Sequence, residues 1–176
     1  MKTLPTISQE DVLQLEQALD YHFRDRTLLD RALTHSSYAN EFGLGAAHNE
    51  RQEFLGDAVL ELCVSWELYT RFPSTREGDL TRLRSALVNT GSFAQRAREV
   101  GLNRMILLGR GEEGQGGRKR DSVLSDVFEA VLGAVYEDGG FAAAQHVIGR
   151  VFKDVWPADP SEGKKELDHK THLQEC

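Results

Sequence analysis

The segment 120–140, RDSVLSDVFEAVLGAVYEDGG, constrains the fold most, because its pattern predicts a helix packed on two sides. Its apolar residues recur at helical spacing and share one broad face. The opposite face carries two acids, Asp126 and Glu129, among short side chains such as Ala130 and Gly133. A solvated face would carry long polar side chains, whereas short ones let another helix approach closely. We therefore predict that Asp126 and Glu129 face a neighbouring helix.

The rest of the chain shows helical rather than alternating periodicity, so the predicted fold class is all-α. Ser8 and Asp11 have the spacing of a capping box at the start of a first helix. Ser74 and Glu77 have the same spacing, and Asn49 is a further candidate cap. The remaining helices are expected at residues 27–33, 50–70, 74–88, 90–101, 121–137 and 141–155. Loops are expected at 36–48 and 109–117, which contain several glycines.

Four acids on the predicted helix 50–70 fall on one narrow stripe at about 100° per residue; they are Glu50, Glu53, Asp57 and Glu61. Carboxylates at such spacing repel one another. They are tolerated either on a solvated face or, if they are buried, beside a cation that neutralises them. If this stripe meets Asp126 and Glu129, the resulting oxygen-only cluster suits Mg²⁺, with Mn²⁺ as a substitute.

Charge and composition limit the alternatives. The chain has 21 Lys and Arg against 28 Asp and Glu, a net charge of −7, which by itself argues against a nucleic-acid partner. No apolar run is long enough for a membrane span, and the first eight residues do not resemble a secretory signal. Cys63 falls in an apolar helical run and is expected in the core. We expect a cytoplasmic protein.

Acids on paired helices that hold hard cations generally serve phosphate chemistry. From spacing alone, three function classes remain open. They are an all-α nucleotide pyrophosphohydrolase, a metal-dependent nuclease, and a module that binds RNA without cutting it.

Residues 48–60, HNERQEFLGDAVL, resemble the signature of the ribonuclease III family. Four further segments resemble bacterial ribonuclease III in the same order along the chain, so the resemblance extends over about residues 8–155. They are LTHSSYANE (33–41), REGDLTRLRSALVN (76–89), LLGRGEEGQGGRKR (107–120) and DSVLSDVFEAVLGAVYEDGG (121–140). Gln52 and Ala58 depart from the usual signature, where an aliphatic residue and Ser are common.

The resemblance implies an endoribonuclease that hydrolyses double-stranded RNA to 5′-phosphate and 3′-hydroxyl ends with short 3′ overhangs. Its roles would be processing of rRNA precursors and of other structured RNAs, including mRNA and tRNA. The resemblance assigns a Mg²⁺-binding active site to four carboxylates, with Asp57 and Glu129 most directly catalytic and Glu50 and Glu77 as auxiliary acids. The four are Glu53, Asp57, Asp126 and Glu129.

The resemblance also implies a homodimer in which Phe54 inserts into a pocket on the partner; the alternative is that Phe54 belongs to the core. Two sites related by a two-fold axis suit the two antiparallel strands of a duplex. Candidate RNA contacts are His35, Ser36, Arg82, Arg84, Arg110, Arg118, Lys119 and Arg120. The alternative for each arginine is a solvated charge, and for the histidine a structural role.

The last residues, DHKTHLQEC (168–176), resemble the start of a double-stranded-RNA-binding domain. We therefore expect a catalytic domain at 1–156, a linker at 157–167 and the truncated start of an RNA-binding domain at 168–176.

Overall fold

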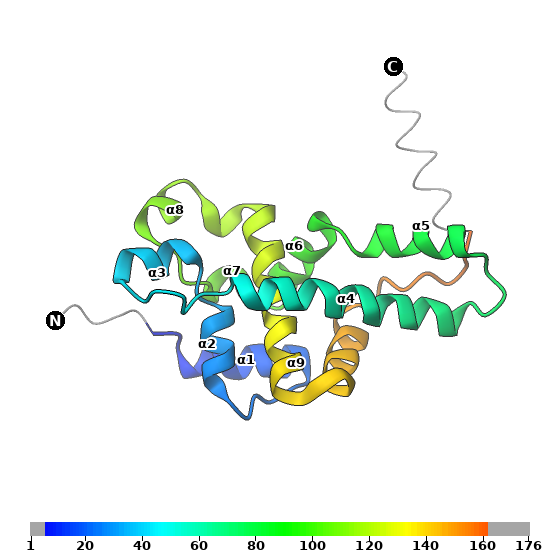
Figure 1. The fold of residues 1–176 in the computed structure, drawn as a ribbon, viewed down its shortest axis with the longest axis horizontal. Helices are drawn as coiled ribbons and strands as arrows, with labels where there is room; N and C mark the ends of the chain where they lie inside the picture. Colours follow the sequence, from blue (N-terminus) through cyan, green and yellow to red (C-terminus); the bar gives the residue numbers. More distant parts are fainter. Residues whose placement is uncertain (1–5, 162–176) are drawn as a thin grey trace, which may run out of the picture.

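The structure is a computed structural model that describes residues 6–161. It confirms the all-α prediction (Figure 1). The helices are α1 (Gln9–Leu19), α2 (Arg26–Ala32), α3 (Ser36–Phe42), α4 (Glu50–Arg71), α5 (Glu77–Leu87), α6 (Thr90–Glu99), α7 (Leu102–Met105), α8 (Arg110–Gly114), the 3-10 helix η1 (Gly117–Lys119) and α9 (Asp121–Val151). The β structure of the described residues is one isolated parallel bridge between Thr34 and Leu107.

Helices α4 and α9 cross at the centre of the molecule (Figure 1). Two glycines lie at the crossing and bring the two backbones into contact. A Cβ atom added to Gly56 on α4 would lie 1.8 Å from the carbonyl oxygen of Glu129 on α9. A Cβ atom added to Gly133 would lie 2.3 Å from the carbonyl oxygen of Gln52. Because real side chains never approach backbone atoms so closely, only glycine permits this crossing.

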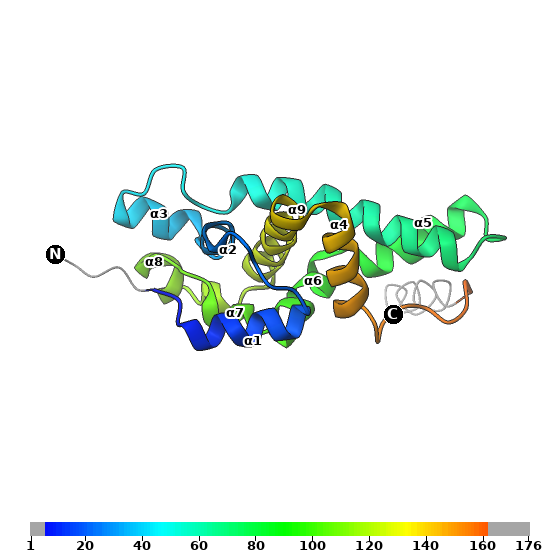
Figure 2. The same cartoon turned by 90° about the horizontal axis from the view of Figure 1, so that it is seen from below.

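The apolar face of α9 forms the core, as its periodicity predicts. Phe128 is fully buried and its ring packs against those of Phe93 of α6 and of Phe152, which follows α9, at ring centroid distances of 5.5 and 6.3 Å. Helix α2 packs on α9 as well, and α1 lies below it (Figure 2). Cys63 is buried, as expected, and burial raises the pKa of its thiol to about 11. Residues 123–135 of α9 are thus buried or half-buried on all sides, with the two acids at the α4 crossing.

Helix starts follow the predictions only in part. The Ser8 hydroxyl oxygen accepts a hydrogen bond from the Asp11 amide at 3.0 Å, which confirms the first cap. The predicted capping box of Ser74 and Glu77 is wrong, because α5 begins at Glu77 and its cap residue is Arg76. Asn49 precedes α4, yet its side chain donates to the Ala32 carbonyl oxygen instead of capping the helix.

Both predicted loops contain helix. Residues 36–48 include α3, which His35 caps through its ring nitrogen, and residues 109–117 include α8. The predicted break at Gly139-Gly140 is confirmed, because Gly140 takes a non-helical φ of 77° and ψ of −170°, and two helical segments of α9 meet there at a kink. Within the described residues no helix is long and apolar enough to cross a membrane. The predicted domain start at 168–176 and most of the predicted linker lie outside the described residues.

The glycine crossing predicts which substitutions the fold does not tolerate. Gly56→Ala and Gly133→Ala should each lower the free energy of unfolding by about 2–3 kcal/mol, because the added methyl group meets backbone that cannot move aside. Gly149→Ala, in open space on the same helix α9, should change it by less than about 1 kcal/mol and in the stabilising direction. Urea denaturation at matched protein concentration measures all three. Equal effects at the three positions would contradict the crossing.

Candidate active site

The crossing places acids from both helices in one cluster, as the stripe on α4 predicts. One carboxylate oxygen each of Glu53, Asp126 and Glu129 lies within 4.8 Å of the other two. All three side chains are half-buried. Asp57, one turn after Glu53 on α4, is exposed at the edge of this cluster and interacts with Glu129.

Burial makes the charged forms of these acids unfavourable. Burial, followed by the charges of Asp126, Glu50 and Asp57, raises the pKa of Glu53 to about 7. Burial, followed by the charge of Asp57 and of the other two acids, raises the pKa of Glu129 to about 8. Burial also raises the pKa of Asp126, opposed by nearby His35. Without a bound cation, Glu53 and Glu129 therefore keep their protons to a higher pH than ordinary glutamates do.

The donor set fits a hard divalent cation. Among the described residues, no Lys or Arg forms an ion pair with any of these carboxylates. Three oxygen donors within reach of one ion, with raised pKa values and no ion pair to Lys or Arg among the described residues, match the ligand preference of Mg²⁺ or Mn²⁺. Glu50 is exposed one turn before Glu53 and adds further negative charge at the opening of the site.

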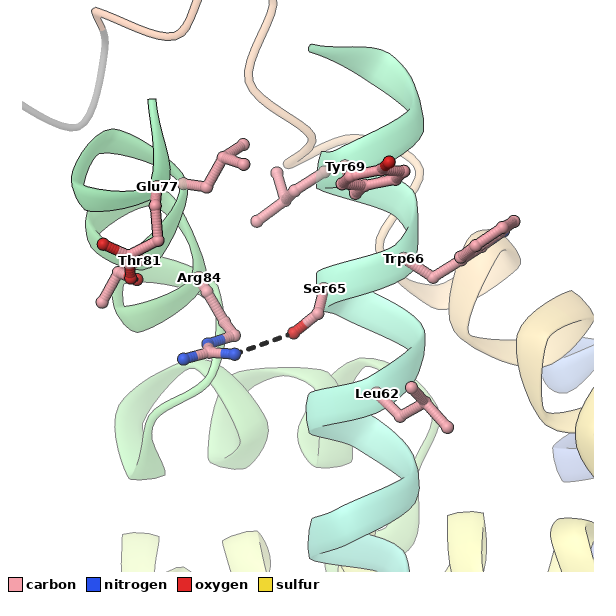
Figure 3. A pocket seen from close by; sticks show the side chains of 9 residues that line it. Leu62, Ser65, Trp66, Tyr69, Glu77, Thr81 and Arg84 are labelled. Carbon is pink, nitrogen blue, oxygen red and sulfur yellow. Dashed lines mark hydrogen bonds between the residues drawn. The ribbon is translucent and has the colours of Figure 1, made fainter. Parts of the chain in front are cut away.

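Glu77 lies elsewhere in the protomer. It lines a cavity of about 430 Å³ between α5 and the second half of α4, beside Tyr69 (Figure 3). Its carboxylate accepts a hydrogen bond from the Thr81 hydroxyl at 2.7 Å. Since Tyr69 is 16 residues beyond Glu53 on the same helix, Glu77 is separated from the cluster by roughly 24 Å along α4.

Helix α4 also carries four large apolar side chains on the surface. Phe54 is 83% exposed, so it does not belong to the core of the protomer. Leu62, Trp66 and Tyr69 are also exposed and follow it along the same helix, ending at the cavity of Figure 3. These three residues were not among the predicted site residues, although their helical spacing from one another indicates a shared face.

Each of the five arginines predicted to contact RNA has an ion-pair or hydrogen-bond partner within the protomer. Their partners are Asp79 for Arg82, the Ser65 hydroxyl for Arg84, Glu41 for Arg110, Glu113 for Arg118 and Glu112 for Arg120. Arg118 also donates to the Asn103 carbonyl oxygen, and its guanidinium lowers the pKa of Glu113. Lys119 is exposed, and Ser36 is the first residue of α3. The pairs of Arg110, Arg118 and Arg120 hold α8 and its flanks together. RNA contact by any of the candidate residues stays a prediction.

The comparisons of this chain with known proteins agree on one family. The Ribonuclease-III-like family model matches residues 25–155. Ribonuclease 3 of Oleidesulfovibrio alaskensis is 56% identical over 162 residues, which are 92% of this chain and 70% of that protein. Ribonuclease 3 of Nitratidesulfovibrio vulgaris is 52% identical over 162 residues, which are 92% of this chain and 64% of that protein. The chain thus spans about two thirds of the length of these relatives.

A solved structure of the nuclease domain of ribonuclease III from Campylobacter jejuni is also similar. It has a TM-score of 0.77 and 41% identity, and the match covers 86% of this chain and 100% of that one. A second structure of that domain, with a TM-score of 0.76 and 43% identity, covers 82% and 98% and is described by flexibility in a region involved in dimer formation.

The raised pKa values predict how stability depends on pH. Glu53 and Glu129 bind protons more tightly in the folded chain than at their ordinary pKa of 4.5, so metal-free stability should fall as pH rises from about 4.5 to about 8. Glu129→Gln should flatten this fall and stabilise the metal-free protein at pH 8 by roughly 2 kcal/mol, since it removes a half-buried charge. Urea denaturation from pH 5 to 8.5 in EDTA measures both; a steeper fall for the variant would contradict the electrostatics.

Proposed function

Because the chain belongs to the ribonuclease III family, we propose that it cleaves double-stranded RNA in a reaction that depends on Mg²⁺ or Mn²⁺. The products are 5′-phosphate and 3′-hydroxyl ends with short 3′ overhangs. The observation that carries this proposal is the convergence of Glu53, Asp126 and Glu129 oxygens within 4.8 Å. Processing of rRNA precursors, mRNA and tRNA in the cytoplasm is the corresponding cellular role.

The proposed chemistry divides between the acids. A bound divalent cation would supply charge stabilisation at the scissile phosphate and would activate the attacking water. Glu53, Asp126 and Glu129 would hold it, because their oxygens converge and their protons are readily displaced at neutral pH. Asp57, exposed beside Glu129, is placed to orient the attacking water and to accept its proton.

Both other function classes are less well supported. A pyrophosphohydrolase would share paired acidic helices but not the match of residues 25–155 to the Ribonuclease-III-like family. A module that only binds RNA has no use for half-buried acids whose charges repel one another. Retention of such a cluster favours catalysis, because the acids destabilise the fold unless a metal is present.

We further propose that the protein acts as a two-fold dimer through the exposed face of α4. Phe54 is too exposed and too apolar for a free surface position, and Leu62, Trp66 and Tyr69 extend the same face. A second copy would cover these side chains and would place two acidic sites on the two strands of one duplex. Glu77 lies roughly 24 Å along α4 from the acidic cluster of its own protomer, so its role as an auxiliary acid stays a prediction.

Cleavage is tested with the purified protein, long duplex RNA and Mg²⁺ at low salt. We expect short duplex products from the wild type and at least a 1,000-fold lower rate from Glu129→Gln, because the variant lacks one of the converging carboxylates. Glu137→Gln, which removes an exposed acid two turns further along α9, should cleave at the wild-type rate. Release of pyrophosphate from nucleoside triphosphates, with the RNA left intact, would contradict the proposed reaction.

The dimer is tested by sedimentation velocity. Phe54→Asp should shift the protein to monomers, because a charge replaces an apolar side chain that we place in the interface. Leu13→Asp, a matched change at a 47% exposed leucine on α1, should leave the dimer intact. A dimer that survives Phe54→Asp unchanged would place the interface elsewhere.

A further inference from the structure

Glu53, one of the three converging acids, lies in the first turn of α4. It is the fourth residue of that helix, and the side chain of Asn49, which precedes the helix, makes no capping hydrogen bond. The ends of helices fray readily when their amides have no side-chain acceptor. Negative charge on Asp126 opposes ionisation of Glu53 and acts to push this turn away from α9. The position of Glu53 therefore depends on contacts outside α4.

Asn49 supplies such a contact, because it joins the start of α4 to the end of α2. Its side-chain amide donates to the Ala32 carbonyl oxygen at 3.2 Å, and its backbone amide donates to the Thr34 carbonyl oxygen at 2.9 Å. Its own carbonyl oxygen accepts from the Glu53 amide at 2.8 Å. Asn49 is only 2% exposed, so water competes little with these hydrogen bonds. One buried residue thus connects α2 to the backbone of Glu53.

Helix α2 is fixed at both of its ends, so it can hold α4 in place. At its start, the backbone amides of Arg24 and Asp25 donate to the Asp138 carboxylate of α9, each at 2.9 Å. At its end, the Leu33 carbonyl oxygen accepts from the Leu107 amide at 2.8 Å. Because Asp138 lies on the helix that carries the other two acids of the cluster, α2 links both helices of the site.

We propose that Asn49 is a positioning residue of the acidic site. Its side-chain hydrogen bond to α2 holds the first turn of α4 in place and keeps the Glu53 carboxylate beside those of α9 before a metal binds. Asparagine usually caps the helix that it precedes, but here its side chain forms the link to α2 instead. The opposite side of the same turn rests on α9, where a Cβ atom on Gly133 would lie 2.3 Å from the Gln52 carbonyl oxygen. The inference rests on the proposed function only in taking Glu53 as a metal ligand.

Two substitutions separate positioning of Glu53 from a general contribution to stability. Serine is a favourable N-cap residue, so Asn49→Ser keeps a capping residue before α4 but is too short to donate to the Ala32 carbonyl oxygen. The matched control Thr34→Val removes a different hydrogen bond at the same end of α2, from the Thr34 hydroxyl to the Asp30 carbonyl oxygen at 2.7 Å. It leaves both links of Asn49 to α2 in place. Each variant should lower the Tm by roughly 2–4 °C.

Mn²⁺ titration by calorimetry on the RNA-free protein, together with thermal unfolding, tests the effect on the metal site. We expect Asn49→Ser to bind Mn²⁺ about tenfold more weakly than the wild type, because residues that orient metal ligands contribute to affinity on that scale. Thr34→Val should bind Mn²⁺ like the wild type despite its lower Tm. Unchanged Mn²⁺ affinity in Asn49→Ser, or equal weakening in both variants, would overturn the inference.

Amide hydrogen exchange of the metal-free protein locates the change within α4. The Glu53 amide should exchange faster in Asn49→Ser than in Thr34→Val, because only the first variant releases the turn that contains it. The amide of Leu60, two turns further along α4, should exchange at the same rate in both variants. Equal exchange of the Glu53 amide in the two variants would overturn the inference and would leave Asn49 with a general stabilising role.

The proposed function and this inference fail in different ways. Failure of the wild type to cleave duplex RNA would overturn the proposed function alone, since neither measurement requires RNA. A folded wild type that binds no Mn²⁺ would overturn both, because Glu53 would then not be a metal ligand.

Discussion

The contact between the backbones of α4 and α9 at Gly56 and Gly133 is the constraint on which the rest of the structure depends. Side chains at these two positions would separate the helices. Separation would move the carboxylates of Glu53 and Glu129 apart and would open the site to water. The same close approach that buries these acids raises their pKa values, so packing and electrostatics at the site have one cause.

Burial of the acidic cluster lowers the free energy of unfolding unless a cation is bound, so the cluster favours cation binding. A bound cation would offset negative charge at the site where the proposed RNA substrate binds. The net charge of −7 includes the three carboxylates of Glu53, Asp126 and Glu129, which a bound metal ion would neutralise. The arginines near α8 do not provide a free basic surface, since Arg110, Arg118 and Arg120 are paired with acids of the same protomer. Local recognition of the duplex is then expected to depend on bound metal and on low salt.

Much of the site could be predicted from the sequence, because helical periodicity fixes which residues share a face. The acids of α4 and the short residues around Asp126 and Glu129 predicted a close helix crossing, which the structure contains. Helix α3 could not be predicted, since its cap is a histidine ring nitrogen rather than a typical capping residue. The distant position of Glu77 depends on how α5 packs against α4, which local sequence does not encode.

We propose that the carboxylates brought together by the glycine crossing hold the catalytic metal. Crystals grown with Mn²⁺ test it most directly, because anomalous scattering locates the ion without reference to activity. We expect a peak within about 2.5 Å of carboxylate oxygens of Glu53, Asp126 and Glu129, at the ligand distances typical of hard divalent cations. A well-ordered cluster without a peak, in a protein that cleaves duplex RNA with Mn²⁺, would contradict it.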